Sequence, residues 1–180
     1  MTDRPLPQQA MCTSLASLLA TVHAPNRAAF TRAFWATMKR EWTNIDVLRM
    51  EKFLLLTRRV VGAQLALCRD AAWADDAVRA QLALLEEVPL DVADVRVPMG
   101  IRYHVIDIYV DELERAGALR DGRPGVALET LLAPLRELAG SSPTKSVREK
   151  ARGALADERL PGNERADVEM QDEGWGGIED

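Results

Sequence analysis

The sequence predicts an all-α protein of antiparallel helical pairs, in an α-solenoid or HEAT-like arrangement, followed by a disordered acidic C-terminal tail. Apolar side chains recur at helical spacing in seven successive stretches of the 180-residue chain. Short loops separate these stretches, which favours stacked pairs of helices over a closed four-helix bundle. We therefore expect a helical domain at residues 1–156 and the tail at 157–180.

The first two helices are expected at about 8–22 and from Asn26 to about residue 41. Pro25 ends the first of them, because proline disfavours helical backbone in the residue that precedes it. Asn26 is the expected N-cap of the second helix, in which aromatic residues recur every four positions on one face.

A third, long helix is expected from Ile45 to about Arg69. Asn44 is its expected N-cap, and Asp46 places negative charge in the first turn, where the helix dipole favours it. The second and third helices would meet at a tight corner with aromatic side chains facing each other. The apolar stripe of the third helix comprises Ile45, Leu48, Phe53, Leu55, Leu56 and Val60.

The fourth and fifth helices flank a loop. The acidic pair at 75–76 opens the fourth helix, and residues 88–98, with two prolines, are expected to form an ordered loop. The stretch 101–110 is rich in β-branched and aromatic residues and is compatible with a strand. Its apolar residues nevertheless follow one helical face, and the helical surroundings offer no partner strand. We interpret this stretch as the fifth helix.

The last two helices follow a turn at 120–125. The sixth contains Pro134 and is expected to kink or restart there, because proline removes one backbone hydrogen bond. Ser142 and Pro143 are expected to cap and open the seventh helix, which ends near residue 156.

The charge of the chain is divided unevenly. Residues 157–180 carry nine acidic and two basic side chains, so the tail contributes −7 to the total of −5 and the rest of the chain carries +2. A domain dedicated to nucleic acid is usually strongly basic, so this charge distribution argues against such a domain.

The chain contains no run of about 18 apolar residues, so no transmembrane helix is predicted. Cys12 and Cys68 fall in apolar helical patterns, which indicates buried free thiols rather than a disulfide.

Three blocks, in order along the chain, resemble one known family. FWATMKREW at 34–42 with IDVLRMEKFLLLTRR at 45–59 forms the first, GIRYHVIDIYVDEL at 100–113 the second, and residues 131–148 a weaker third. They are similar to the eukaryotic ribosomal RNA processing protein 1 family, whose members are nucleolar assembly factors of the large ribosomal subunit. In that family, sequence rich in Trp and Phe precedes the point where residues 1–6 align. The resemblance therefore implies either an N-terminally truncated sequence or a divergent member of the family. If a packing layer is absent, the first two helices are expected to present an apolar, exposed face.

The resemblance also implies a function. The expected protein is a non-enzymatic ribosome biogenesis factor of the nucleolus that acts as a rigid helical scaffold, with no cofactor and no membrane contact. It would support pre-rRNA processing and assembly of the large-subunit precursor. Its partners would be other large-subunit assembly factors in pre-ribosomal particles, with pre-rRNA as a secondary contact.

Candidate contact residues fall at the corner between the second and third helices and on the fifth helix. Basic side chains at the corner are expected either to neutralise RNA phosphates or to form a solvated face paired with nearby acids. The two tryptophans are expected to be core anchors, or hot spots of a protein interface if they are exposed. The corner residues are Trp35, Lys39, Arg40, Trp42, Arg49, Lys52, Arg58 and Arg59, and the fifth helix adds the face from Arg102 to Glu112.

Two other functions are alternatives. A generic α-solenoid adaptor outside ribosome assembly is disfavoured by the three ordered blocks. A metal-dependent hydrolase would use His104, Asp107 and Asp111, which share one helical face and offer one nitrogen and two oxygen ligands. The plainer interpretation is a His104 that is hydrogen-bonded to Asp107 or to a neighbouring helix. The sequence contains no Gly-rich phosphate loop, Cys-x-x-Cys or His-Glu-x-x-His motif.

Overall fold

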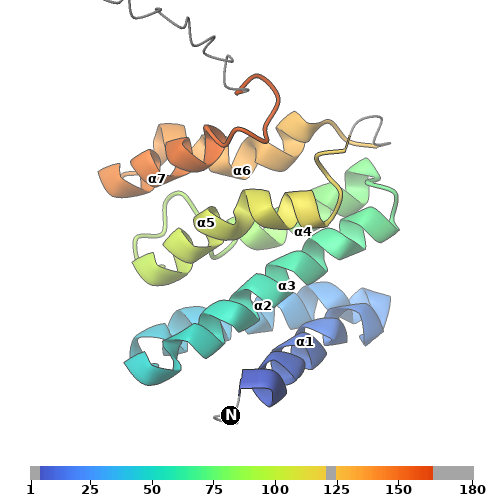
Figure 1. Ribbon diagram of the computed structural model, residues 1–180, viewed down its shortest axis with the longest axis vertical. Coiled ribbons are helices and arrows are strands. Elements are labelled where there is room, and N and C mark those ends of the chain that lie inside the picture. Colours follow the sequence, from blue (N-terminus) through green and yellow to red (C-terminus); the bar gives the residue numbers. More distant parts are fainter. Residues whose placement is uncertain (1–4, 121–124, 164–180) are drawn as a thin grey trace, which may run out of the picture.

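The computed structural model describes residues 5–120 and 125–163, and within these ranges every regular element is a helix (Figure 1). The all-α prediction is therefore confirmed. The calls on residues 121–124 and on the disordered tail beyond 163 lie outside the described residues. The elements are α1 (Pro5–Thr21), α2 (Ala24–Glu41), η1 (Trp42–Asn44), η2 (Val47–Arg49), α3 (Met50–Asp70), α4 (Asp75–Glu86), α5 (Met99–Arg115), α6 (Leu128–Ser141) and α7 (Lys145–Leu155).

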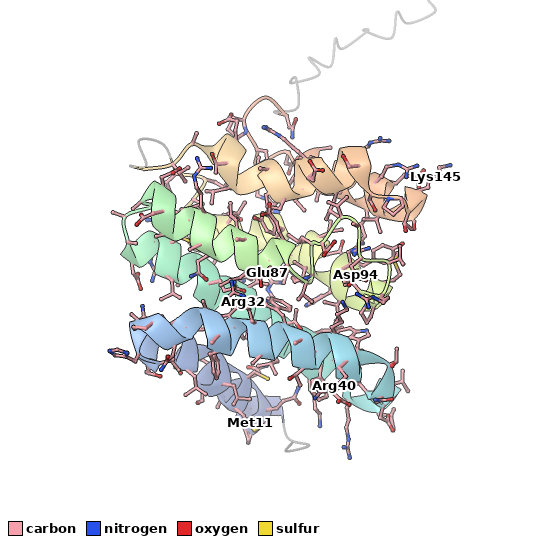
Figure 2. The ribbon with its side chains drawn as sticks, turned by 180° about the vertical axis from the view of Figure 1, so that it is seen from behind. Met11, Arg32, Arg40, Glu87, Asp94 and Lys145 are labelled. Carbon is pink, nitrogen blue, oxygen red and sulfur yellow. The ribbon has the colours of Figure 1, made fainter. Side chains whose placement is uncertain are left out.

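The helices form two layers. Helices α1, α3, α5 and α7 pack side by side in one layer, which faces the viewer in Figure 1, and α2, α4 and α6 form the other, which faces the viewer in Figure 2. Contacts between α3 and α5 join Leu54 to His104 and Arg58 to Glu112, so these helices run in the same direction. Successive helices alternate in direction, which is the arrangement of an α-solenoid. The predicted solenoid-like stack is confirmed.

The core runs between the layers and includes residues from every α-helix. Trp35 is fully buried, and its Nε1 donates to Gln64 Oε1 at 3.2 Å. Tyr109 is also fully buried and donates to the carbonyl oxygen of Leu131 at 2.8 Å. Cys12 and Cys68 are buried free thiols, as predicted, and burial raises the pKa of the Cys68 thiol to about 12. These thiols are therefore structural parts of the core.

The connection between α2 and α3 differs from the prediction. Asn44 is not the N-cap of α3, since its side-chain amide donates to Glu41 at 3.2 Å. Asp46 caps the short helix η2 instead, and its carboxylate accepts a hydrogen bond from the backbone amide of Leu48 at 2.8 Å. Two 3-10 turns therefore separate the long helices, and α3 begins only at Met50. Leu48, which was expected in the apolar stripe of the third helix, is exposed in the structure.

Two other helix starts also differ. Helix α2 begins at Ala24, before the predicted cap Asn26, because Pro25 occupies its first turn, where the missing amide proton is not needed. Helix α7 begins at Lys145 with Thr144 at its N-cap position. Ser142 lies at the C-cap of α6 and packs in the core, so it does not open the next helix. Helix α6 continues through Pro134 without a restart.

Packed structure continues past residue 156. Leu160 is 3% exposed and belongs to the core, and Asn163 donates from its amide to the carbonyl of Leu155 at 2.6 Å. Arg159 reaches back to α5, where it pairs with Asp111 at 2.9 Å. Within the described ranges, no helix has both the length and the apolar character to cross a membrane.

Candidate functional site

The corner between α2 and α3 presents two adjacent apolar side chains to solvent. Val47 is 81% exposed and Leu48 is 87% exposed. Because the carboxylate of Asp46 caps their turn, the pair is held in a defined conformation. Apolar side chains that project in this way are common at protein interfaces.

A groove of about 450 Å³ lies beside this pair, between the end of α2 and the start of α3. Met38, Ile45 and Phe53 supply its apolar lining. Charged residues of both signs stand at the same groove, and they are Glu41, Asp46 and Arg49. The corner is therefore an apolar surface whose rim carries charges of both signs. We refer to Val47, Leu48 and this groove as the corner surface.

The predicted basic cluster does not gather at the corner. Lys39 pairs with Asp94 of the 88–98 loop, and Arg40 pairs with Glu41 at 2.6 Å and projects outward (Figure 2). Arg49 is exposed at the groove, and Lys52 lies beside α1, where its carbonyl faces the Cys12 thiol. Arg58 reaches across to Asp111 and Glu112 of α5, and Arg59 lines a separate cleft. The six cations therefore take part in different contacts.

The two corner tryptophans are core residues. Trp35 is 0% exposed and Trp42 is 7% exposed, so neither can act as a contact for a partner on the surface of the folded chain. The indole of Trp42 packs against Gly100 at the start of α5, where an added Cβ would come within 2.7 Å of the indole Nε1. Trp42 thus fastens the corner to the next helical pair. The core interpretation of both residues is the one that the structure supports.

The predicted face of α5 forms ion pairs between the helices of one layer. His104 Nε2 donates to the carbonyl of Leu54 at 2.8 Å, not to Asp107. Asp107 pairs with Lys150 of α7 at 2.5 Å, and Asp111 pairs with Arg58 of α3 at 3.0 Å. These contacts tie α5 to both neighbours. The hydrogen bond from Arg159, with further bonds from Arg58, lowers the pKa of Asp111.

The same face does not assemble a metal centre. Its three proposed ligands are each engaged with a different neighbouring segment, and in the described part of the chain no three His, Cys, Asp or Glu side chains are placed to hold an ion. A divalent ion would need them to converge on one point. The positions of His104, Asp107 and Asp111 therefore do not favour the metal-dependent hydrolase alternative.

Arg102, the first residue of the predicted α5 face, is buried. Only 1% of it is exposed, and its guanidinium donates to the backbone carbonyls of Asp91 at 2.6 Å and Asp94 at 3.0 Å. Burial lowers the pKa of Arg102, and the nearby Asp91 and Asp94 carboxylates oppose this effect. Arg102 therefore holds the 88–98 loop in place and is not available as a surface contact.

Helix α1 has the apolar, exposed character that was expected for the first two helices. It contains no charged residue from end to end. Leu6 is 77% exposed, and Leu15 and Leu18 are close to 40%, at 41% and 39%. Helix α2 differs, because it exposes Arg32 and Arg40. Arg32 bonds to Glu87, the residue that follows α4, and this contact links α2 to α4 within their own layer (Figure 2).

His104 predicts a specific pH dependence of stability. Burial lowers its pKa below the ordinary value of 6.5, so the unfolded chain takes up a proton at a higher pH than the folded chain does. The free energy of unfolding should therefore decrease as the pH falls from about 6.5 through the lower folded pKa. Urea unfolding at pH 7 and pH 5 measures this loss.

The matched variants for this measurement are His104→Gln and His23→Gln. A glutamine at 104 keeps an amide donor near the Leu54 carbonyl but cannot titrate, so this variant should lose less stability between the two pH values than the wild-type chain. His23 is an exposed turn residue, and its variant should behave as the wild-type chain does. Equal losses in all three proteins would contradict the role given to His104.

These features define an α-solenoid-like protein whose candidate sites are surfaces. A family model described as "Nucleolar protein,Nop52" matches residues 1–176. The chain belongs to this family.

Named relatives agree with the family match. The human ribosomal RNA processing protein 1 homolog B is 36% identical over 119 residues, which cover 64% of this chain and 15% of that protein. The mouse homolog A is 34% identical over 119 residues, covering 66% of this chain and 24% of the relative. The Drosophila melanogaster homolog is 32% identical over 123 residues, which cover 64% of this chain and 17% of that protein. The resemblance to the ribosomal RNA processing protein 1 family is confirmed, and the chain spans less than a quarter of the length of these three relatives.

Proposed function

We propose that this chain is a non-catalytic helical scaffold of ribosome biogenesis, which supports pre-rRNA processing and assembly of the large-subunit precursor in the nucleolus. The match of the nucleolar protein family model to residues 1–176 carries the proposal. The relatives are named as ribosomal RNA processing proteins, which supports the same role. The partners in this proposal are other large-subunit assembly factors in pre-ribosomal particles.

The arrangement of the helices favours a scaffold over an enzyme. Side chains that could perform acid–base or metal chemistry on α5 are engaged in contacts that hold neighbouring helices together. A helical stack held in this way presents extended, stiff surfaces. The scaffold would therefore act by positioning partners, and cleavage of RNA would be the task of another component of the particle.

We propose the corner surface as the contact for a protein assembly factor. Its occupant would be an apolar segment, such as the apolar face of an amphipathic helix, because the exposed pair and the groove lining are apolar. The rim carries Glu41, Asp46 and Arg49, so it favours neither a strongly acidic nor a strongly basic segment. Val47 and Leu48 would insert into the partner while Met38, Ile45 and Phe53 receive its side chains.

The test is affinity purification of the tagged full chain from its own cells. The wild-type chain should recover large-subunit precursors and their assembly factors. The double variant Val47→Asp/Leu48→Asp should recover them about tenfold less, as expected when a contact worth about 1.4 kcal/mol is lost. Its melting temperature should be unchanged, because both side chains are already in water.

Val95→Asp is the matched control. Val95 is 72% exposed in the 88–98 loop, so the variant makes the same chemical change outside the corner surface. It should leave recovery at the wild-type level. Full recovery by the corner variant would contradict the proposed contact, whereas failure of the wild-type chain to recover any large-subunit precursor would contradict the scaffold function itself.

A further inference from the structure

A cleft lined by arginines lies between α3 and α5, which belong to the layer formed by α1, α3, α5 and α7. It has a volume of about 170 Å³. Gly62, Ala66 and Ala116 form its small-residue floor, and Arg59, Arg69 and Arg115 supply its cations. The Glu112 carboxylate lies over Gly62, where an added Cβ would come within 2.7 Å of its Oε2, so a ligand can approach the floor only beside Ala66 and Ala116. The cleft is separate from the corner surface.

Most charges around the cleft are paired, and one is not. The Glu112 carboxylate accepts from Arg58 Nε at 2.6 Å and also from Arg115. Arg69 pairs with its neighbour Asp70 at 2.8 Å. In the described part of the chain Arg59 forms no ion pair, and its Nε is buried without a hydrogen-bond partner. The surplus positive charge of the cleft therefore lies on Arg59.

The position of Arg59 separates it from the other two cations. Arg69 and Arg115 lie in the last turns of α3 and α5, where a positive side chain offsets the negative end of the helix dipole. Arg59 lies in the middle of α3, so the dipole does not account for it. The buried Nε is closed to a ligand, but the guanidinium spreads its charge over all three nitrogens, so an oxyanion in the cleft would supply the ion pair that Arg59 lacks.

The oxyanion that best fits this cleft is a phosphate group. A guanidinium presents a fixed fork of donors that matches two oxygens of a phosphate. Aromatic residues are absent from the cleft lining, so the site offers no platform on which a base could stack. Contacts of this kind hold the nucleic-acid backbone without reading its sequence.

We propose that the cleft at Arg59, Arg69 and Arg115 binds a backbone phosphate of RNA, with Arg59 as the principal donor. This inference rests on the proposed function in ribosome biogenesis, which places the chain among RNA-containing particles, and it adds a specific contact. Asp70, Asp111 and Glu112 flank the cleft, so the site would hold one or two phosphates and would not form an extended RNA track.

The test is binding of a fluorescent single-stranded RNA of about 20 nucleotides to the purified full chain, measured by polarisation across a salt series. We expect Arg59→Gln to weaken binding about tenfold, as for the loss of one charged contact. The slope of log K against log salt should become shallower by about 0.7 for each phosphate contact removed. Arg59→Lys keeps the charge without the fork, and it should give an intermediate affinity even if the glutamine variant does not fold.

The control for this experiment is Arg79→Gln. Arg79 is an exposed arginine on α4, in the other layer, and it pairs with Asp75 at 2.6 Å. It should bind RNA as the wild-type chain does. RNAs of different sequence should bind equally well, because the cleft contacts only the backbone. Equal affinity and equal salt slope for Arg59→Gln and the wild-type chain would overturn the proposal.

Two competitors identify the source of the anion. Inorganic phosphate should displace the RNA only at high concentration and should act less on Arg59→Gln, because a single free ion makes one contact. Polyglutamate should compete weakly, and competition equal to that of RNA would overturn the RNA assignment in favour of an acidic protein segment. A failure here is distinct from a failure of the scaffold function, since recovery of precursors by affinity purification would persist.

Discussion

Replacing Trp35 with alanine is expected to lower the free energy of unfolding by about 3–5 kcal/mol, the range observed when a buried tryptophan is truncated. Trp35 has no exposed surface and lies between α2 and α3. Its removal would leave a cavity at the junction of the two layers. It would also leave the Gln64 side-chain oxygen without the 3.2 Å hydrogen bond from the indole. Urea unfolding and the melting temperature measure the loss.

Two further variants separate the cavity from the hydrogen bond. Trp35→Phe keeps most of the ring volume and should lose about 1–3 kcal/mol, the cost of a buried acceptor without a donor. Leu48→Ala removes an apolar side chain that is 87% exposed and should change stability by less than about 0.5 kcal/mol. If Trp35→Ala were as stable as Leu48→Ala, the place of Trp35 in the core would be wrong.

Replacing Arg102 with methionine is expected to cost about 2–4 kcal/mol. Methionine fills a similar volume, but it cannot donate to the carbonyls of Asp91 and Asp94, and a hydrogen bond from a charged donor contributes about 1.5–3 kcal/mol. Some of this loss is regained because the variant no longer buries a charge, and because the Nε of Arg102 has no hydrogen-bond partner. The 88–98 loop would then become more susceptible to limited proteolysis.

Arg96→Met is the matched control for this prediction. Arg96 lies in the same loop, and its side chain is 82% exposed, so its pairing with Asp94 is screened by water. We expect a change of less than about 0.5 kcal/mol and no new cleavage in the loop. Similar losses for both variants would show that the loop depends on its overall charge instead of the two hydrogen bonds from Arg102.

The sequence predicted the helices where periodicity was long and uninterrupted. Helix α5 could be told from a strand because its apolar positions fit one helical face and its neighbours are helical. The corner between α2 and α3 was harder to predict. The apolar periodicity of α3 extends back through Leu48, but in the structure Asp46 caps a separate 3-10 helix there. A side-chain cap of a backbone amide depends on local dihedral angles that the apolar pattern does not contain.

The candidate site was less predictable than the fold. The basic residues at the corner are clustered in the sequence, but a helix distributes neighbouring residues around its axis, so Arg58 and Arg59 serve different contacts. The partners of Asp107 and Asp111 depend on the register between parallel helices far apart in the chain. Arg102 binds carbonyls of an irregular loop, and any residue type supplies a carbonyl.

The two-layer stack has a consequence for how the molecule responds to load. Each helix touches its sequence neighbours and the adjacent members of its own layer, so α3 and α5 are covered on both sides while α1 and α7 each border one terminal edge. Local unfolding should therefore begin at α1 or α7 and proceed from one helical pair to the next. A binding partner that covers an edge would supply the missing neighbour, and the chain would be most rigid when it is held inside a larger assembly.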